Sequence, residues 1–157
     1  MDIKFFMKRL PDIQLGYYVS KTCDLASDPD PLFTVTGKVR INLIIGEVTV
    51  VVATTTTLLL ETGTNNIPLC AATTITADAV GTLYMLSGDT GAIMNGADAP
   101  ALHVAQLSGV PLAPIIMGLA GGSNTIQSQL DAAGTGNIVF GLWYIPLEIG
   151  AKVVAAA

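Results

Sequence analysis

Charged side chains are scarce in this sequence of 157 residues. Lys, Arg, Asp and Glu together make up 12% of the chain, whereas apolar residues make up 51% and the mean hydropathy is +0.61. An average soluble protein carries about 25% charged residues. Such an apolar chain can bury ample surface, which excludes disorder, and its length suits a single domain. We expect much of its outside to be buried against other subunits. The alternative is a compact monomer with a Thr, Ser, Gly and Asn surface.

Histidine and cysteine are nearly missing. His103 is the only histidine, and Cys23 and Cys70 are the only cysteines. A zinc site needs three or four ligands, and a nucleophile triad needs a base and an orienting acid within hydrogen-bond reach. Asp98 lies near His103, but no serine occupies a Gly-x-Ser-x-Gly turn. We therefore expect no catalytic, cofactor-binding or metal-binding residues, and we expect two inert free thiols rather than one disulfide.

Two weaker chemical signals are also better explained by turns. The glycine cluster at 118–122 lacks the Lys-Ser/Thr pair of a phosphate-binding loop. Asp24, Asp28 and Asp30 lie close enough in sequence to share a calcium ion, but they match no known calcium-binding loop. Loop acids in contact with solvent are the simpler interpretation.

A long, uncharged apolar run is absent as well. The best candidate, residues 41–60, contains Asn42, Glu47 and a threonine run, and its valines and threonines favour strands. The first ten residues are too charged, and their apolar part is too short, for a secretory signal. We expect no membrane partner and a protein made and kept inside a cell, or released from it in a particle.

The few charges are unevenly distributed along the chain. Residues 1–40 carry six basic and five acidic side chains, whereas from residue 41 onward only Lys152 is basic, against seven acids. An acidic body repels phosphate backbones. Nucleic acid is therefore not an expected partner.

Strand patterns fill the chain from Leu32 onward. About eight to ten short segments rich in Val, Ile and Thr are separated by turn signals, and no helical period extends beyond two turns. This pattern predicts an all-β fold: a single β-sandwich or jelly-roll-like β-barrel domain over 32–157. Residues 1–31, which close with Asp-Pro-Asp-Pro, are predicted to form an extended N-terminal arm.

One predicted strand begins at Lys38 and alternates polar and apolar residues. This alternation places Val39, Ile41 and Leu43 toward the core. Gly46 and Glu47 then predict a turn or bulge.

Two further predicted strands are dense in apolar residues. Residues 48–53 are mostly β-branched and favour a strand buried on both faces. Residues 137–145 contain Phe140, Trp143 and Tyr144 and are expected to form the aromatic centre of the core, with Tyr144 on the other face as an alternative.

The predicted arm carries four aromatic side chains: Phe5, Phe6, Tyr17 and Tyr18. Aromatic residues dominate the energetics of protein interfaces. We therefore predict that these four residues anchor the arm on its own domain or on a neighbouring subunit.

Four segments carry a resemblance to a known class of protein: residues 37–49, 54–61, 71–84 and 143–153. Their texture of Thr-, Ala-, Gly- and Val-rich strands with a Trp-Tyr-Ile-Pro-Leu-Glu-Ile-Gly-Ala ending resembles small virion proteins of tailed bacteriophages, of the capsid decoration, cement or head-completion type. The resemblance covers residues 33–157 and transfers no functional residue.

This resemblance implies a non-enzymatic structural protein of a phage particle. It would be made in the host cytoplasm, reside in the virion and decorate or cement the capsid lattice. Its expected partners are further copies of itself, forming a homotrimer, and the major capsid protein. The alternatives are a neck or head-completion protein, a receptor- or glycan-binding module of a fibre, and a small hydrolase or ligand-binding barrel.

Overall fold

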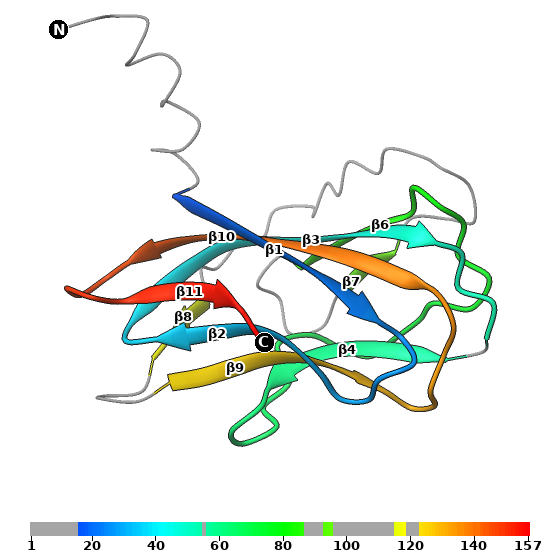
Figure 1. Cartoon of the computed structure of the whole chain (residues 1–157), viewed down its shortest axis with the longest axis horizontal. Helices are drawn as coiled ribbons and strands as arrows, with labels where there is room; N and C mark the ends of the chain where they lie inside the picture. Colours follow the sequence, from blue (N-terminus) through cyan, green and yellow to red (C-terminus); the bar gives the residue numbers. More distant parts are fainter. Residues whose placement is uncertain (1–15, 55, 87–92, 96–114, 119–122) are drawn as a thin grey trace, which may run out of the picture.

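A computed structural model describes residues 16–54, 56–86, 93–95, 115–118 and 123–157 (Figure 1). These residues form β-strands joined by turns, and none of them is helical. The strands are β1 (Tyr17–Asp24), β2 (Asp30–Thr36), β3 (Val39–Val50), β4 (Thr57–Thr62), β5 (Thr73–Thr74), β6 (Leu83–Leu86), β7 (Ile93–Asn95), β8 (Ile115–Met117), β9 (Ser123–Leu130), β10 (Asn137–Pro146) and β11 (Lys152–Ala155).

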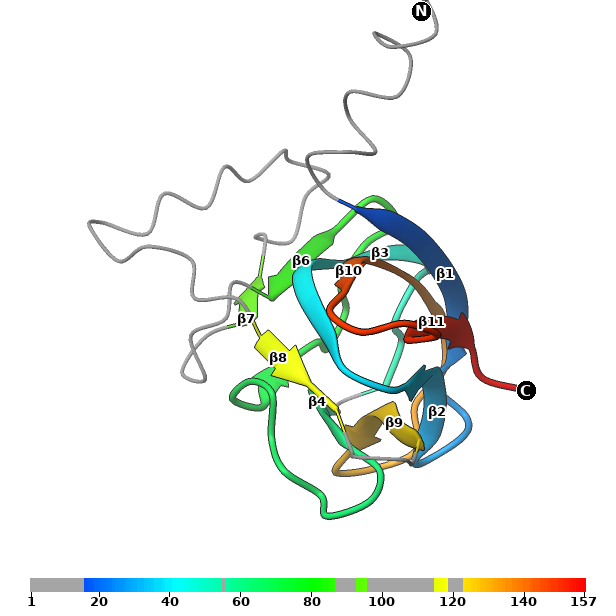
Figure 2. The same cartoon turned by 90° about the vertical axis from the view of Figure 1, so that its left-hand side faces the viewer.

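The strands make two antiparallel sheets packed face to face, which confirms the predicted all-β sandwich. The six-stranded sheet has the order β1-β10-β3-β6-β7, and β8 pairs with the first residues of β3. The five-stranded sheet has the order β11-β2-β9-β4-β5. Seen end-on in Figure 2, β1, β11 and β2 follow one another along one side of the sandwich.

The core lies between the sheets and follows the two-residue period of the strands. On β10, the inward positions are Ile138, Phe140, Leu142 and Tyr144, and all four are buried. Side chains alternate between the two faces of a strand, so the intervening residues of β10 face outward. Phe140 and Tyr144 therefore belong to the core as predicted, whereas Trp143 lies on the outer face.

A β-bulge near the start of β3 reverses which of its side chains face the core. Trp143 pairs with Leu43 and Tyr144 pairs with Ile41, which leaves Asn42 as an extra residue. Val39 and Ile41 face the core as predicted, but the next inward residue is Ile44. The prediction for Leu43 is wrong because an extra residue reverses the alternation.

Gly46 does not make a turn. It lies inside β3, opposite Phe140, and a Cβ atom there would come 2.6 Å from Cε1 of that ring. Only a small residue leaves room for the Phe140 ring at this position. The glycine that meets this need was interpreted as a turn signal in the sequence, and that prediction is wrong. The strand continues to Val50, and Val50 and Val51 are exposed. The prediction that 48–53 is buried on both faces is therefore wrong.

The structure places residues 17–31 in the sandwich rather than in an arm. All eight residues of β1 pair with β10, and β2 begins at Asp30. The Asp-Pro-Asp-Pro sequence that suggested a domain boundary belongs to the β1–β2 connection and the start of β2. Residues 1–15, with Phe5 and Phe6, lie outside the described residues, so their anchoring role stays a prediction.

Candidate functional site

Strand β1 carries the two predicted anchor residues that the structure describes. Tyr17 is 65% exposed and Tyr18 is 56% exposed. The Tyr17 ring lies 5.7 Å from that of Tyr144, and the Tyr18 ring lies 4.6 Å from that of Trp143 (centroid distances). Both tyrosines are thus accessible, yet the folded domain itself holds them in place.

The Tyr18 ring also explains a glycine on β10. A Cβ atom on Gly141 would lie 2.8 Å from Cε2 of Tyr18, so only glycine leaves room for the ring to lie across the strand. The ring therefore covers part of the outer face of the six-stranded sheet. This arrangement brings Tyr18 and Trp143 together from distant parts of the chain.

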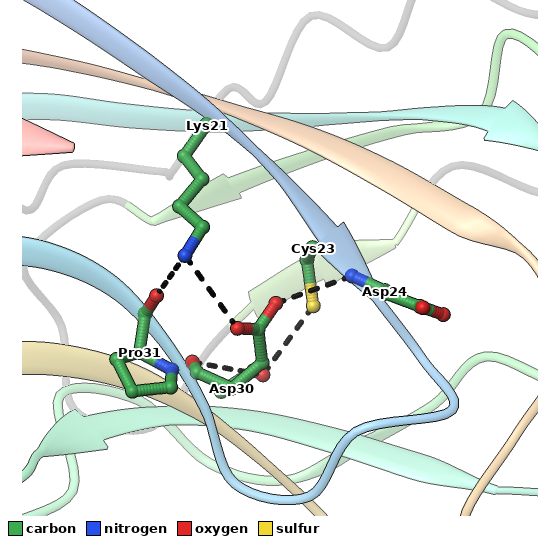
Figure 3. Close-up of polar contacts among 6 residues, drawn as sticks. Lys21, Cys23, Asp24, Asp30 and Pro31 are labelled. Carbon is green, nitrogen blue, oxygen red and sulfur yellow. Dashed lines mark hydrogen bonds and ion pairs between the residues drawn. The ribbon is translucent and has the colours of Figure 1, made fainter. Parts of the chain in front are cut away.

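A polar cluster ties β1 to the other sheet (Figure 3). The Lys21 ammonium donates to the Pro31 carbonyl at 2.7 Å and lies 3.7 Å from Oδ1 of Asp30. The other oxygen of Asp30 accepts the backbone N–H of Asp24 at 3.2 Å. Since β1 and β2 belong to different sheets, these contacts close one side of the sandwich.

The same cluster contains Cys23, but its surroundings do not activate the thiol as a nucleophile. The Cys23 thiol is buried and donates to Oγ of Ser128 at 3.3 Å. Burial raises the pKa of Cys23 to about 12, and the nearby Asp30 also acts to raise it. A thiol is reactive as its thiolate, so this one is inert at neutral pH. Lys, Asp, Cys and Ser here form a structural contact between the sheets.

The second thiol is equally enclosed. Cys70 is buried, and its sulfur accepts the N–H of Leu60 at 3.2 Å. Burial raises its pKa as well. Cys23 and Cys70 are both free, which agrees with the prediction of two inert thiols.

The three acids considered for calcium form contacts with the protein instead. Asp24 accepts the N–H of Ala26 at 3.0 Å, Asp28 accepts the N–H of Leu130 at 2.9 Å, and Asp30 pairs with Lys21. Within the described ranges, no group of three or more His, Cys, Asp or Glu side chains could hold a metal ion. His103 and Asp98 lie outside those ranges.

The outer face of the six-stranded sheet is apolar. Residues paired across β1, β10, β3 and β6 form three outward rows: Tyr18, Trp143 and Leu43; Ser20, Gly141, Ile45 and Met85; Thr22, Val139, Glu47 and Leu83. Glu47 is the only charged member of these rows. The apolar side chains on β10, β3 and β6 are half-buried, although they point away from the core.

Sequence reasoning missed this surface, although a signal was present. Residues 43–45 and 137–146 are apolar at nearly every position, a pattern typical of strands covered on both faces. We assigned that pattern to 48–53, where the structure shows exposed valines. A strand that is apolar on both faces was therefore correctly expected, but it was assigned to the wrong segment.

Comparison of the chain with protein-family models, with curated proteins and with solved structures finds no significant match. In the part of the chain that the structure describes, no helix is long and apolar enough to cross a membrane. The function must therefore be inferred from the surfaces described above.

Proposed function

We propose that this chain is a non-enzymatic structural protein that packs on other protein subunits, and that it decorates or cements the capsid lattice of a phage particle. The observation that carries the proposal is the apolar outer face of the six-stranded sheet. One face of an antiparallel sheet usually contacts solvent and is polar. Here that face is mostly apolar over three neighbouring strands, β10, β3 and β6.

Burying this face against a neighbour would contribute free energy toward assembly. Its half-buried apolar side chains are Leu43, Ile45, Leu83, Met85, Val139 and Trp143. Fully burying a large apolar side chain contributes about 1.5–3 kcal/mol, and these side chains are already partly buried, so completing the burial of each contributes at most about 1 kcal/mol. Association costs much of this gain for a single contact, but many copies on one lattice bind cooperatively through effective concentration.

The phage-particle part of the proposal is supported by the resemblance of residues 33–157 to small virion proteins and by the low charge of the chain. A protein covered by neighbours on a lattice has little need of a charged surface. A neck or head-completion role would use the same contacts at another place in the particle.

The test is binding of the purified protein to capsid particles produced from the neighbouring genes, measured by co-sedimentation. Ile45→Lys places a charge at the centre of the outer face and should abolish binding while the thermal unfolding curve stays close to that of the parent protein. Asn65→Lys, in the exposed turn after β4, is the control and should bind normally. Normal binding by Ile45→Lys would refute the assigned face, and failure of the parent protein to bind would refute the role.

A second candidate function is a receptor- or glycan-binding module of a fibre. It is favoured by one observation: the exposed ring of Tyr18 lies beside Trp143, and such a pair of rings can stack on a sugar. A glycan array probed with the parent protein and with Tyr18→Ser separates the two candidates. Hits that disappear in the variant support sugar binding, and an array without hits argues against it.

A further inference from the structure

The two ends of the sandwich carry opposite charge. We define the basic end as residues 37–40, 115–118 and 145–152, and the acidic end as residues 24–30, 50–54, 76–82 and 131–136. Antiparallel pairing places the first group together where β3 begins and the second where β3 ends, at the left and right of Figure 1. The described part of the sandwich therefore carries its charge asymmetrically, from one end of β3 to the other.

The basic end has three exposed cations, Lys38, Arg40 and Lys152, against one exposed acid, Glu148. The Glu148 carboxylate is itself occupied, because it accepts the backbone N–H of Lys38 at 2.8 Å. The net charge of this end is therefore positive, although the whole chain has a formal net charge of −5.

The acidic end contains only acids among its described charged residues. Asp24, Asp28 and Asp131 are exposed there, and Asp78 is buried. Asp30 pairs with Lys21, so it adds little to the field outside the protein. An approaching basic surface would find uncompensated negative charge.

Each end also exposes large aliphatic side chains. The basic end presents Ile116, Leu147 and the fully exposed Ile149. The acidic end presents Val50, Val51 and Val80, each about half exposed. Folding leaves these six side chains in contact with water, so burial against a partner is the gain they can offer.

The loop that carries Leu147 and Ile149 connects β10 to β11, and it is held in place before any partner binds. The Leu147 N–H donates to the Lys38 carbonyl at 2.9 Å, and the Ala151 N–H donates to the Glu148 carbonyl at 3.2 Å. Gly37 lies so close to this loop that a Cβ atom there would be 2.7 Å from Oε1 of Glu148. A contact made by such a preorganised segment loses little conformational entropy on binding.

We propose that the basic end of one copy docks on the acidic end of a second copy, so that the protein assembles head to tail. The two ends differ in charge and each carries an aliphatic patch, which is the complementarity that a heterologous contact between identical subunits requires. Such a contact closes into a ring, of which a trimer is one case, or extends as a stack. This inference rests on the proposed assembly role and specifies one of its partners.

The test uses one substitution at each end. Ile149→Asp places an acid on the basic end, and Val51→Lys places a base on the acidic end. Both side chains are exposed in the single subunit, so neither change should affect folding. Each should weaken self-association by about tenfold or more, measured by native mass spectrometry and sedimentation at several concentrations. Ile67→Asp, at another exposed isoleucine, is the control and should associate like the parent protein.

Mixing the two variants distinguishes this arrangement from a symmetric contact. Each variant keeps one intact end, so an equimolar mixture should form heterodimers while each variant alone is monomeric. Added salt should weaken association of the parent protein, because opposite charges are screened. A monomeric parent protein, unaffected self-association in both variants, or a mixture without heterodimers would each overturn the proposal.

Two further measurements separate related possibilities. Flotation with vesicles of anionic lipid tests whether the basic, aliphatic end binds a membrane instead, and binding lost in Ile149→Asp would overturn the head-to-tail assignment. Particle binding that persists while self-association is absent would overturn this inference and leave the assembly role intact. Self-association that persists without particle binding would support this inference and overturn the proposed role on a capsid lattice.

Discussion

Replacing Gly46 with alanine should destabilise the sandwich, because the added methyl group meets side chains that are fixed in the core. The new Cβ atom would lie 2.6 Å and 3.0 Å from two carbons of the Phe140 ring and 3.1 Å from Cγ2 of Ile138. Phe140 is only 2% exposed, and its ring has little room to retreat. Inserting a methyl group into a packed core typically costs about 1–3 kcal/mol.

A smaller effect acts in the opposite direction. Where the backbone conformation is compatible, alanine stabilises a protein by about 0.4–1 kcal/mol relative to glycine through the unfolded state. Overpacking is the larger effect, so Gly46→Ala should lower the free energy of unfolding by about 1–2 kcal/mol. At this chain length the expected fall in Tm is about 2–8 °C.

Urea unfolding followed by the fluorescence of Trp143 measures the change. Phe140→Leu removes the ring carbons nearest the new methyl group, so in that background Gly46→Ala should cost less than half as much. Glu47→Ala, at the neighbouring exposed position, is the control and should stay within about 0.5 kcal/mol of the parent protein.

A neutral or stabilising Gly46→Ala would refute this reasoning. That result is the one expected if Gly46 lay in an exposed turn, as the sequence pattern suggested. Equal costs in the Phe140 and leucine backgrounds would show that the ring is not what excludes the methyl group.

Three further predictions concern titratable groups. The thiols of Cys23 and Cys70, whose pKa values burial raises, should not react with a thiol reagent at about pH 8 in the folded protein, and both should react after unfolding in denaturant. Tyr84→Phe should cost about 1–3 kcal/mol in urea unfolding, because the buried Tyr84 hydroxyl donates to the Asp78 carboxylate. Burial and this hydrogen bond raise the pKa of Tyr84, so its stabilising contribution is full below about pH 10 and declines above it. Above that pH, Tyr84→Phe should therefore lose less stability with rising pH than the parent protein does. A backbone amide and a threonine hydroxyl near the start of β4 lower the pKa of Asp131. Its contribution to stability is therefore present above about pH 4 and disappears as the carboxylate is protonated at lower pH. Asp131→Asn should flatten the acid limb of a curve of Tm against pH.

Local patterns were sufficient for the fold class and for much of the core. The alternation in residues 38–41 correctly placed Val39 and Ile41 inside, because side chains on a strand point to opposite faces in turn. The same rule failed at Leu43, since the bulge at Asn42 depends on the pairing of β3 with β10, about 100 residues away.

The predicted anchor residues also show which features local sequence patterns reveal and which depend on pairing between distant strands. Tyr17 and Tyr18 were predicted to anchor an arm on its own domain or on a neighbouring subunit, whereas the structure places both on a paired strand of the sandwich, with their side chains exposed. Their strand is held by β10 and by the Lys21–Asp30 pair, neither of which can be inferred from residues 1–31 alone. The two charged ends were also missed, because Lys38 and Lys152 become neighbours only when the strands pair.

The sequence by itself determined that this protein is all-β, favoured two free thiols over a disulfide and showed that its charge is low for an ordinary exposed surface. Those properties depend on residue types and on a two-residue period, both of which are local. Only the tertiary structure decided that the apolar rows lie on the outer face of one sheet and that opposite charges gather at opposite ends. Strand order and register determine both features, and they result from pairings between segments far apart in the chain.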